Sequence, residues 1–560
     1  MTASDGPRAM STPAPATSQR PDWAPCRHGY DASCLGIHLP GRTACLAHVD
    51  PTDRADYLAR LRPGDHLDHR GTPFTESLLQ SLLQPLWDPG TRRHTVGSGR
   101  FDRATFTGNA DFNVAAFYGP VWFNGATFTG EAGFTAATFN EPVWFDKATF
   151  TGAASFTAAT FTSVAGFMAT IFDDTAQFKG ATFTTAPSFG PLVCRGQVDI
   201  SSAVFEKPVT LEIAAREVNC VRTQWKSTAD LRLRYATVDV SDAVLSSPVK
   251  VAAHSLLFTA AGEAVDESML AKSNAGVRVT SLRGVDAAHL VLTDIDLSDC
   301  LFSGAVHLDQ LSLEGLCTFA RTPTGIRRRP KMWPYCWTAR RTLAEEHHWR
   351  AKEAGPANPE PPRGWNARPS HRGPVPRPED LAATYRQLRK AFEDHKNEPG
   401  AADFYYGEME MRRHDQTGTS GAERGLLWAY WLLSGYGLRA LRALSWLLAT
   451  MLLTVVLLML FGLPAQRTAQ HTTGTLTNGH AISLSTTPLV PQGAVPGPLR
   501  DRFNWRRVER ATRTAVNSVV FRSAGQGLTT SGTYIEMASR LAEPILLLLA
   551  VLAVRGRIKR

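Results

Sequence analysis

The chain has 560 residues, of which 43% are hydrophobic and 20% are charged, so most of it can build a folded core and wholesale disorder is excluded. Its 60 lysine and arginine residues exceed its 51 acidic residues, and the formal net charge of +9 is too mild to identify a partner by itself. Eight cysteines in a chain of this length exclude a short disulfide-stapled secreted scaffold.

The N-terminal region divides into a tail and a cap. Residues 1–20 are rich in Pro, Ser, Thr and Ala and contain no apolar run, which predicts a disordered tail. Residues 21–98 form the predicted N-terminal cap, with Cys and His residues near its start. The leucine spacing between residues 53 and 87 is typical of amphipathic helices, so we expect the cap to be helical.

Four residues of the cap have the chemistry of a metal site. Cys26, Cys34, Cys45 and His48 follow one another in the order C-x7-C-x10-C-x2-H. Three thiolates and one imidazole are a ligand set of structural zinc, and the segment is too short to build a core of its own. We therefore predict a structural zinc ion at these residues. The alternative is that the cysteines are reduced side chains packed within the cap, because only the last step has tight spacing.

An eleven-residue repeat occupies residues 104–191. Its eight units run without a gap, from ATFTGNADFNV to ATFTTAPSFGP, and successive phenylalanines are alternately six and five residues apart. A helix would place apolar residues three and four apart and a strand two apart, so this spacing predicts a corner after each short extended stretch. Ala usually stands two positions before each Phe, and residues two apart on extended backbone point to the same face. The predicted core ladder consists of the third residue of each unit: Phe106, Phe117, Phe128, Phe139, Phe150, Phe161, Phe172 and Phe183.

This pattern resembles the pentapeptide-repeat family, whose members coil into a right-handed quadrilateral β-helix. The resemblance implies a mainly β solenoid with a Phe-filled interior over residues 99–191. The extra residue in every second repeat should enlarge each coil to roughly 22 residues, so that Phe128 stacks on Phe106 and Phe161 on Phe139. After residue 191 the period degrades, and a five-residue step then returns with Leu in place of Phe. We expect residues 192–318 to continue as a divergent β-helix.

The composition changes after the repeats. Residues 319–378 are rich in Arg, Trp and Pro, which predicts a basic linker. Basic and aromatic residues together suit either nucleic acid or an anionic membrane surface. The long apolar segment that follows favours the membrane, so we expect contact with anionic lipid and no nucleic acid. Within the linker, the run from Glu345 to His348 is expected to be a solvated helix face, because adjacent residues on a helix cannot converge on one metal ion.

The C-terminal third predicts a helical hairpin and two transmembrane helices. Residues 379–424 form the amphipathic hairpin, which accounts for Asp403, Glu408 and Glu410 without a catalytic site. The transmembrane helices are assigned to residues 425–464 and 538–555, separated by an extracytoplasmic or re-entrant segment over residues 465–536. Arg439 and Arg442 precede the first apolar run, so the positive-inside tendency places the bulk of the chain in the cytoplasm.

This third of the chain resembles that of bacterial pentapeptide-repeat membrane proteins. In such relatives the two C-terminal spans enclose a pore helix and filter like those of two-helix cation channels. The matching stretch here, Ser523–Gly527, lacks the run of carbonyls ending in a GYG-like turn that a potassium filter needs. The resemblance therefore implies a multi-pass protein of the bacterial cell membrane without a recognisable selectivity filter.

The motifs point to a binding protein and not to an enzyme. The sequence contains no P-loop, GxSxG, HExxH or Rossmann fingerprint, and no cofactor other than the structural zinc is expected. The leading hypothesis is a membrane-anchored scaffold that presents a cytoplasmic β-helix to an unknown protein partner, with homo-oligomerisation left open. One alternative is a degenerate two-helix ion channel. The other is a DNA mimic that protects topoisomerases, although the repeat region is only weakly acidic.

Overall fold

The protein consists of two compact units, residues 1–373 and residues 374–560, which are described separately. The computed structural model describes residues 22–26, 34–324, 326–327, 335–336, 338–353, 365, 375–464, 470–477, 481–488, 502–520 and 528–558. The predicted tail, residues 1–20, lies outside this part of the chain.

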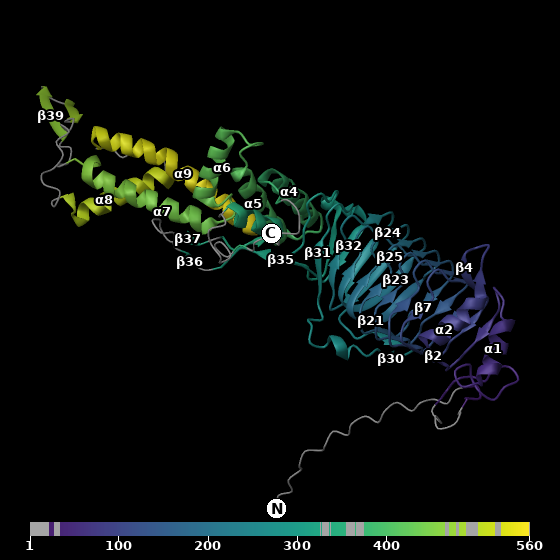
Figure 1. Ribbon diagram of the computed structural model, residues 1–560. Coiled ribbons are helices and arrows are strands. Elements are labelled where there is room, and N and C mark those ends of the chain that lie inside the picture. The colour runs from purple at the N-terminus through teal and green to yellow at the C-terminus, as the bar shows by residue number, and fades with distance from the viewer. Residues whose placement is uncertain are drawn as a thin grey trace, which may run out of the picture. The chain divides into compact units, whose positions relative to one another are not determined.

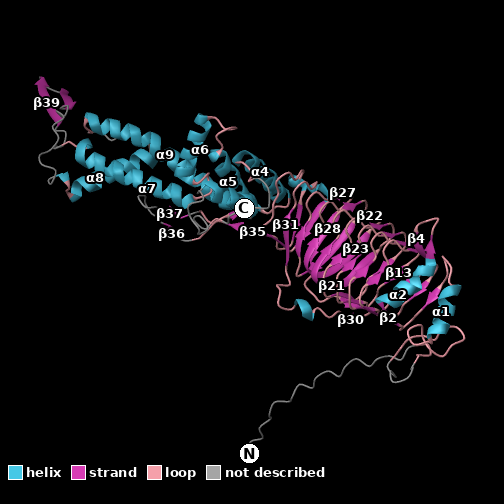
Figure 2. Ribbon diagram, viewed as in Figure 1, coloured by secondary structure: helices cyan, strands magenta, loops and turns pink. Residues whose placement is uncertain are grey.

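The first unit is built around a parallel β-solenoid of about ten turns over residues 95–319, as the sequence predicted (Figures 1 and 2). Each eleven-residue unit forms two short strands separated by turns, and each strand pairs with its equivalent one coil away. The strands of the Phe-rich coils are β6 (Thr105–Thr107), β7 (Ala110–Asp111), β8 (Ala116–Phe117), β9 (Val121–Trp122), β10 (Thr127–Phe128), β11 (Ala132–Gly133), β12 (Thr138–Phe139), β13 (Val143–Trp144), β14 (Thr149–Phe150), β15 (Ala154–Ser155), β16 (Thr160–Phe161), β17 (Ala165–Gly166), β18 (Thr170–Phe172), β19 (Ala176–Gln177) and β20 (Thr182–Phe183).

Left-handed backbone marks one corner of each repeat unit. Arg103, Val114 and Ala136 have φ values of 54°, 59° and 55°, and each directly precedes an inward-facing alanine. Gly125 and Gly180 occupy the same position in two other units, with φ of 64° and 66°. This conformation turns the chain, so the following Ala and Phe both point into the solenoid.

The coil length changes along the solenoid. In the Phe-rich part, equivalent residues are 22 apart, as in the pairing of Phe128 with Phe150, which confirms the predicted enlargement. Beyond Phe205 the step falls to 20 residues, because Phe205 pairs with Trp225 and Trp225 with Leu245. The divergent part has therefore returned to four five-residue repeats per coil, and its side chains continue the same inward column.

The interior of the solenoid is filled with stacked aromatic rings. The eight predicted ladder residues fall into two columns, as the 22-residue coil requires, and all are at most 1% exposed. Within these columns, rings of successive coils are within 10° of parallel and have centroids 4.6–5.2 Å apart. Rings of neighbouring columns meet edge-on, as Phe106 does with Phe112 at 5.8 Å and 81°. Offset stacks and edge-to-face contacts are the favoured aromatic geometries, so this filling is the core of the fold.

The divergent coils have longer strands and one excursion. Residues 254–276 leave the wall, and a buried ion pair between Arg234 and Glu267 (2.8 Å) fastens them back onto it. The elements of this part are β21 (Ser188–Asp199), β22 (Val204–Phe205), β23 (Val209–Asn219), β24 (Gln224–Trp225), β25 (Ala229–Arg234), β26 (Thr237–Asp239), β27 (Val244–Leu245), β28 (Val249–Ala253), β29 (Thr259–Ala260), β30 (Glu263–Ala264), η2 (Ser268–Leu270), β31 (Val277–Ser281), η3 (Ala287–His289), β32 (Leu290–Thr293), β33 (Ile295–Leu297), η4 (Leu308–Gln310) and β34 (Ser312–Glu314).

The N-terminal cap is only partly helical, which corrects the prediction. Strands β1 and β2 pair in parallel with β5 and β6, so the first coil begins inside the cap, and Phe74 stacks on Phe106 at 5.2 Å. Strands of two or three residues leave no periodicity that a sequence could reveal. The cap consists of α1 (Pro51–Arg60), β1 (Leu67–Asp68), β2 (Pro73–Thr75), α2 (Glu76–Leu83), η1 (Gln84–Leu86), β3 (Trp87–Asp88), β4 (Arg93–Val96) and β5 (Gly99–Arg100).

The predicted linker 319–378 is in part a C-terminal cap. Strand β38 pairs antiparallel with β35, and the helix α3 follows directly. Trp365 is also buried, at 1% exposure, with its ring edge-on to His347. The described elements here are β35 (Thr318–Arg321), β36 (Ile326–Arg327), β37 (Tyr335–Cys336), β38 (Arg341–Thr342) and α3 (Ala344–Glu353).

The second unit is helical. Residues 440–462 and 530–555 form two helices that are long and apolar enough to cross a membrane. The range predicted for the first span, 425–464, is wrong at its start, because Gly435, Tyr436 and Gly437 all have positive φ and end α6 before α7 begins. The elements are α4 (Pro378–Asp394), α5 (Glu398–His414), α6 (Gly421–Ser434), α7 (Ala440–Leu457), the π-helical turn η6 (Leu458–Gly462), β39 (Gln470–Thr477), β40 (Ala481–Pro488), α8 (Trp505–Val520) and α9 (Thr530–Ile558).

Candidate functional site

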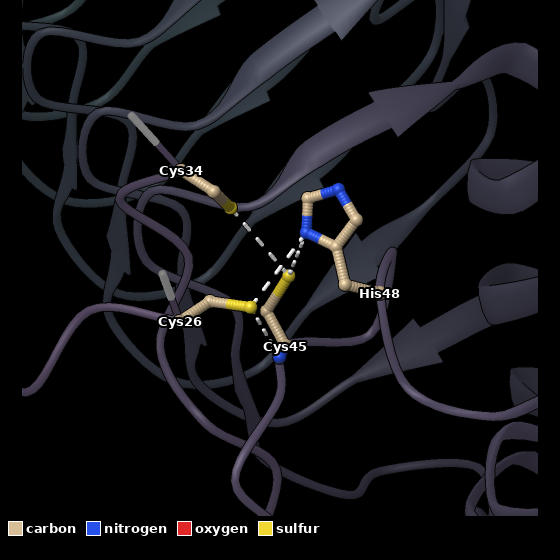
Figure 3. Close-up of side chains that lie close together, drawn as sticks. All are labelled: Cys26, Cys34, Cys45 and His48. Atoms are coloured by element: carbon tan, nitrogen blue, oxygen red, sulfur yellow. Dashed lines mark hydrogen bonds between the residues drawn. The ribbon is translucent and has the colours of Figure 1, made fainter. Parts of the chain in front are cut away.

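The structure brings the four predicted metal ligands together (Figure 3). Cys45 and His48 belong to one tight turn, in which the backbone N–H of His48 donates to the carbonyl of Cys45 at 3.0 Å. This turn places side chains three residues apart on the same side, which is why the C-x2-H spacing suits a shared ligand. Cys26 and Cys34 approach from two other segments, and all three cysteines are buried.

The separations between these atoms match the edges of a zinc tetrahedron. Zn–S bonds of about 2.3 Å and a Zn–N bond of about 2.05 Å require S···S edges of roughly 3.8 Å and S···N edges of roughly 3.6 Å. The Sγ atoms of Cys34 and Cys45 are 3.8 Å apart. His48 Nδ1 lies 3.6 Å from Cys26 Sγ and 3.5 Å from Cys45 Sγ. The four ligand atoms all lie within 4.8 Å of one another, so the cluster can hold a metal ion such as zinc.

The surroundings of the cluster suit thiolate ligands. The backbone N–H of Gly36 points at Cys34 Sγ (3.4 Å), and that of Cys45 points at Cys26 Sγ (3.3 Å). A Cβ on Gly36 would lie 2.6 Å from the Cβ of Cys45, so glycine is needed for this close approach. Burial raises the pKa of the Cys45 thiol to about 12, and the coordinated cation would favour the thiolate that burial alone disfavours.

The cluster is attached to the first coil of the solenoid. The backbone N–H of Ile37 donates to the carbonyl of Arg70 at 2.8 Å, beside the turn that leads into β2. Next to that turn, the fully buried His69 lies edge-on to Phe74 at 5.7 Å and extends the aromatic stack, and burial lowers its pKa to about 4. Sequence reasoning missed His69, because nothing in the sequence marks it as the end of the aromatic core.

The outside of the Phe-rich coils has one aromatic column. Trp122 and Trp144 are equivalent outward residues of β9 and β13, and their rings lie 5.3 Å apart. The guanidinium of Arg100 on β5 lies 5.3 Å from the ring of Trp122. Tryptophan and arginine are the side chains most enriched in protein–protein hot spots.

Comparison with protein families matches this solenoid. A model of pentapeptide repeats in nine copies matches residues 97–138 and 115–160. The rod is a pentapeptide-repeat solenoid. Comparisons with curated proteins and with solved structures gave no match. Pentapeptide-repeat solenoids are typically structural or interaction folds.

The C-terminal end of the pentapeptide-repeat solenoid is closed by α3, and the predicted solvated face at residues 345–348 is wrong. Glu345 is 2% exposed, and its Oε1 accepts the backbone N–H groups of Phe302 (2.6 Å) and Ser303 (2.8 Å). Burial raises the pKa of Glu345 to about 7. Glu346 is also buried, between Arg340 (2.6 Å) and Arg350 (2.7 Å). Charged residues face the solenoid here because its last coil exposes backbone groups that need partners.

The acidic residues of the α4–α5 hairpin form ion pairs. Glu408 accepts from Arg386 at 3.0 Å and from Arg389 at 2.8 Å, which ties α5 to α4. Glu410 contacts Arg413 at 2.6 Å and accepts from the Tyr436 hydroxyl at 3.3 Å. The stretch compared with a channel filter, residues 523–527, lies outside the described residues.

Proposed function

We propose that the protein is a membrane-anchored scaffold, in which α7 and α9 hold the chain in a bilayer and the pentapeptide-repeat solenoid presents its outer faces to a protein partner. The observation that carries the proposal is the presence, in one chain, of a solenoid with a filled aromatic interior and two candidate membrane spans. A filled interior has no room for a substrate, so the outer faces are the surface available for binding.

The proposed orientation places the solenoid in the cytoplasm of a bacterial cell. Arg439 and Arg442 lie at the start of α7, and the positive-inside tendency retains such residues on the cytoplasmic side. Trp428 and Trp446 are exposed near the same end, at 49% and 39%, and tryptophan is enriched at membrane interfaces. Anionic lipid headgroups are the matching partner for this arginine and tryptophan cluster.

We propose zinc as the metal at Cys26, Cys34, Cys45 and His48, with a structural role. All four tetrahedral positions are taken by protein ligands, which leaves none for a substrate. The ion would hold the segment around residues 26–49 against the first coil and so close the N-terminal end of the solenoid.

Membrane fractionation tests the anchor. Full-length protein should sediment with membranes and resist extraction by alkaline carbonate, whereas a chain truncated to residues 1–373, which lacks the second unit, should remain in the soluble fraction. Full-length protein that stays soluble without detergent would refute the proposal.

Crosslinking followed by affinity purification tests the docking face. Proteins recovered with the wild-type chain should be lost when Trp122 and Trp144 are both changed to Ala. The matched control changes Thr149 and Thr160, outward residues of other faces, to Ala and should recover the same proteins. Equal loss in both variants would refute this choice of face.

A further inference from the structure

A carboxyl group is buried between the two candidate spans. Glu543 lies in the middle of α9 and is 0% exposed, whereas Leu541, Ile545 and Leu548 on the same helix are 50–71% exposed. Its Oε1 faces α7, where it lies 2.8 Å from the hydroxyl of Thr454. The helices α7 and α9 run side by side, so this contact joins the two spans (Figure 1). An ionisable group at such a depth marks a functional site more often than a structural one.

Counting hydrogens at this contact identifies the protonation state. The Thr454 Oγ lies 2.9 Å from the carbonyl oxygen of Thr450 as well as 2.8 Å from Glu543 Oε1. The hydroxyl has one hydrogen, and a carbonyl oxygen can only accept. Threonine in a helix commonly donates to the carbonyl four residues earlier. When the Thr454 hydrogen is used in this way, the second contact needs a hydrogen from Glu543, which is then a neutral carboxylic acid.

The charges around Glu543 agree with a neutral group. Elements α6, α7, η6 and α8 pack against α9. The charged residues on these elements and on α9 itself, among those with described side chains, are Glu423, Arg424, Arg442, Arg506, Arg507, Glu509, Arg510, Arg513, Glu536, Arg540 and Arg555. None of them acts on the Glu543 carboxyl, whose surroundings are set by burial and by the Thr454 hydroxyl. The nearest arginine along α9, Arg540, instead donates to Glu536 at 2.9 Å.

The second carboxyl oxygen is unused. Glu543 Oε2 is buried and has no hydrogen-bond partner among the described residues. An ionised carboxylate with a bare oxygen would be strongly disfavoured here, whereas a neutral acid leaves only a weak acceptor unpaired. The free oxygen is also the position from which a proton can leave or arrive without breaking the contact to Thr454.

We propose that Glu543 is a proton-binding site between the two spans, occupied in this structure, whose proton joins α9 to α7 through Thr454. The bound ligand is a proton and not a metal cation, because the carboxyl acts as the donor in its own contact. Release of the proton lets the Thr454 hydroxyl turn from the Thr450 carbonyl towards the carboxylate, so proton exchange changes the hydrogen bonding between the helices. The site rests on the proposed membrane placement of α7 and α9.

Labelling with dicyclohexylcarbodiimide tests the site in the full-length chain extracted from membranes. This apolar reagent needs the acid form: the acid proton moves to a carbodiimide nitrogen while the carboxyl oxygen bonds to the central carbon, and rearrangement gives a stable adduct. Peptide mass spectrometry should locate the adduct on Glu543, and labelling should fall as the pH rises. The variant E543Q should lose it, and E509Q, at an exposed glutamate of α8, should retain it.

The variant E543Q also checks the hydrogen count independently. A Gln amide can donate to Thr454 as the neutral acid does, so E543Q should keep the wild-type melting temperature in detergent, whereas E543A should melt lower. Absence of an adduct on Glu543 across the pH series, or labelling blocked by sodium at constant pH, would overturn the proton assignment. A full-length chain found in the soluble fraction would instead refute the membrane placement, so the two failures are distinguishable.

Discussion

The stacked interior makes a quantitative prediction at Phe139. Its ring is fully buried, between Phe117 at 4.9 Å and Phe161 at 5.2 Å, both within 5° of parallel. Phe139→Ala removes both stacking contacts and leaves a cavity that backbone strands on each side cannot close. Truncation of a buried Phe costs about 3–5 kcal/mol, and the loss of two parallel ring contacts places this site towards the upper end.

Residues 1–373 contain the solenoid and both caps, so this unit is suited to the measurement. Guanidinium unfolding followed by circular dichroism should give the full loss in free energy of unfolding for Phe139→Ala. Thr160→Ala is the matched control, because Thr160 is the outward neighbour of Phe161 and pairs in register with Thr138; it should cost less than about 0.5 kcal/mol. Thr138 itself is a poor control, since its hydroxyl accepts from Arg93 at 2.7 Å.

Overpacking provides the complementary measurement. Ala137 is fully buried in the same coil, and Ala137→Leu should cost about 1–3 kcal/mol because the wall cannot expand. A cost for Thr160→Ala equal to that for Phe139→Ala would show that the assignment of inward and outward residues is wrong.

Three further predictions concern the caps and the helical hairpin. Wild-type protein purified with zinc should contain about one equivalent of zinc by atomic emission, and Cys45→Ser should lose it and melt at a lower temperature. Glu345 has its pKa raised from 4.5 to about 7, so the unfolded state ionises first as the pH rises; between these values the free energy of unfolding of the wild type should fall relative to Glu345→Gln by up to about 3 kcal/mol, and a pH-independent difference would contradict this. In Gly407→Ala the new Cβ would lie 2.4 Å from the ring of Tyr385, so we expect α4 and α5 to separate and the melting temperature to fall, whereas Gly421→Ala, with open space, should change little.

The sequence revealed those features that repeat or that rest on chemistry. Sixteen regularly spaced phenylalanines specify a coil, because each one has the same neighbours one coil away. The coil length of 22 residues followed from the same spacing. The four metal ligands were found from residue type alone, although Cys26 and Cys34 are brought to Cys45 by loops whose course no pattern predicts.

The sequence did not reveal features that occur once. The fall to 20 residues per coil after Phe205 coincides with the loss of the repeat motif that would have shown it. Glu345 looked like a solvent-facing residue because acidic residues on helices usually are. Its burial depends on the backbone N–H groups of Phe302 and Ser303, which are exposed only because the solenoid ends there. A break between α6 and α7 was likewise hidden within a continuous apolar composition.

Both ends of the solenoid are covered by the chain itself, and this limits how the protein can associate. An open β-solenoid offers unpaired backbone groups at each end and would add further copies there. At the N-terminal end α2 packs against β2 and β7, and the Cys26–His48 cluster is held to the first coil. At the C-terminal end Glu345 accepts two of the exposed N–H groups. With the interior filled and the ends capped, recognition by the solenoid must use its side faces, where Trp122 and Trp144 provide the one outward aromatic column of the Phe-rich coils.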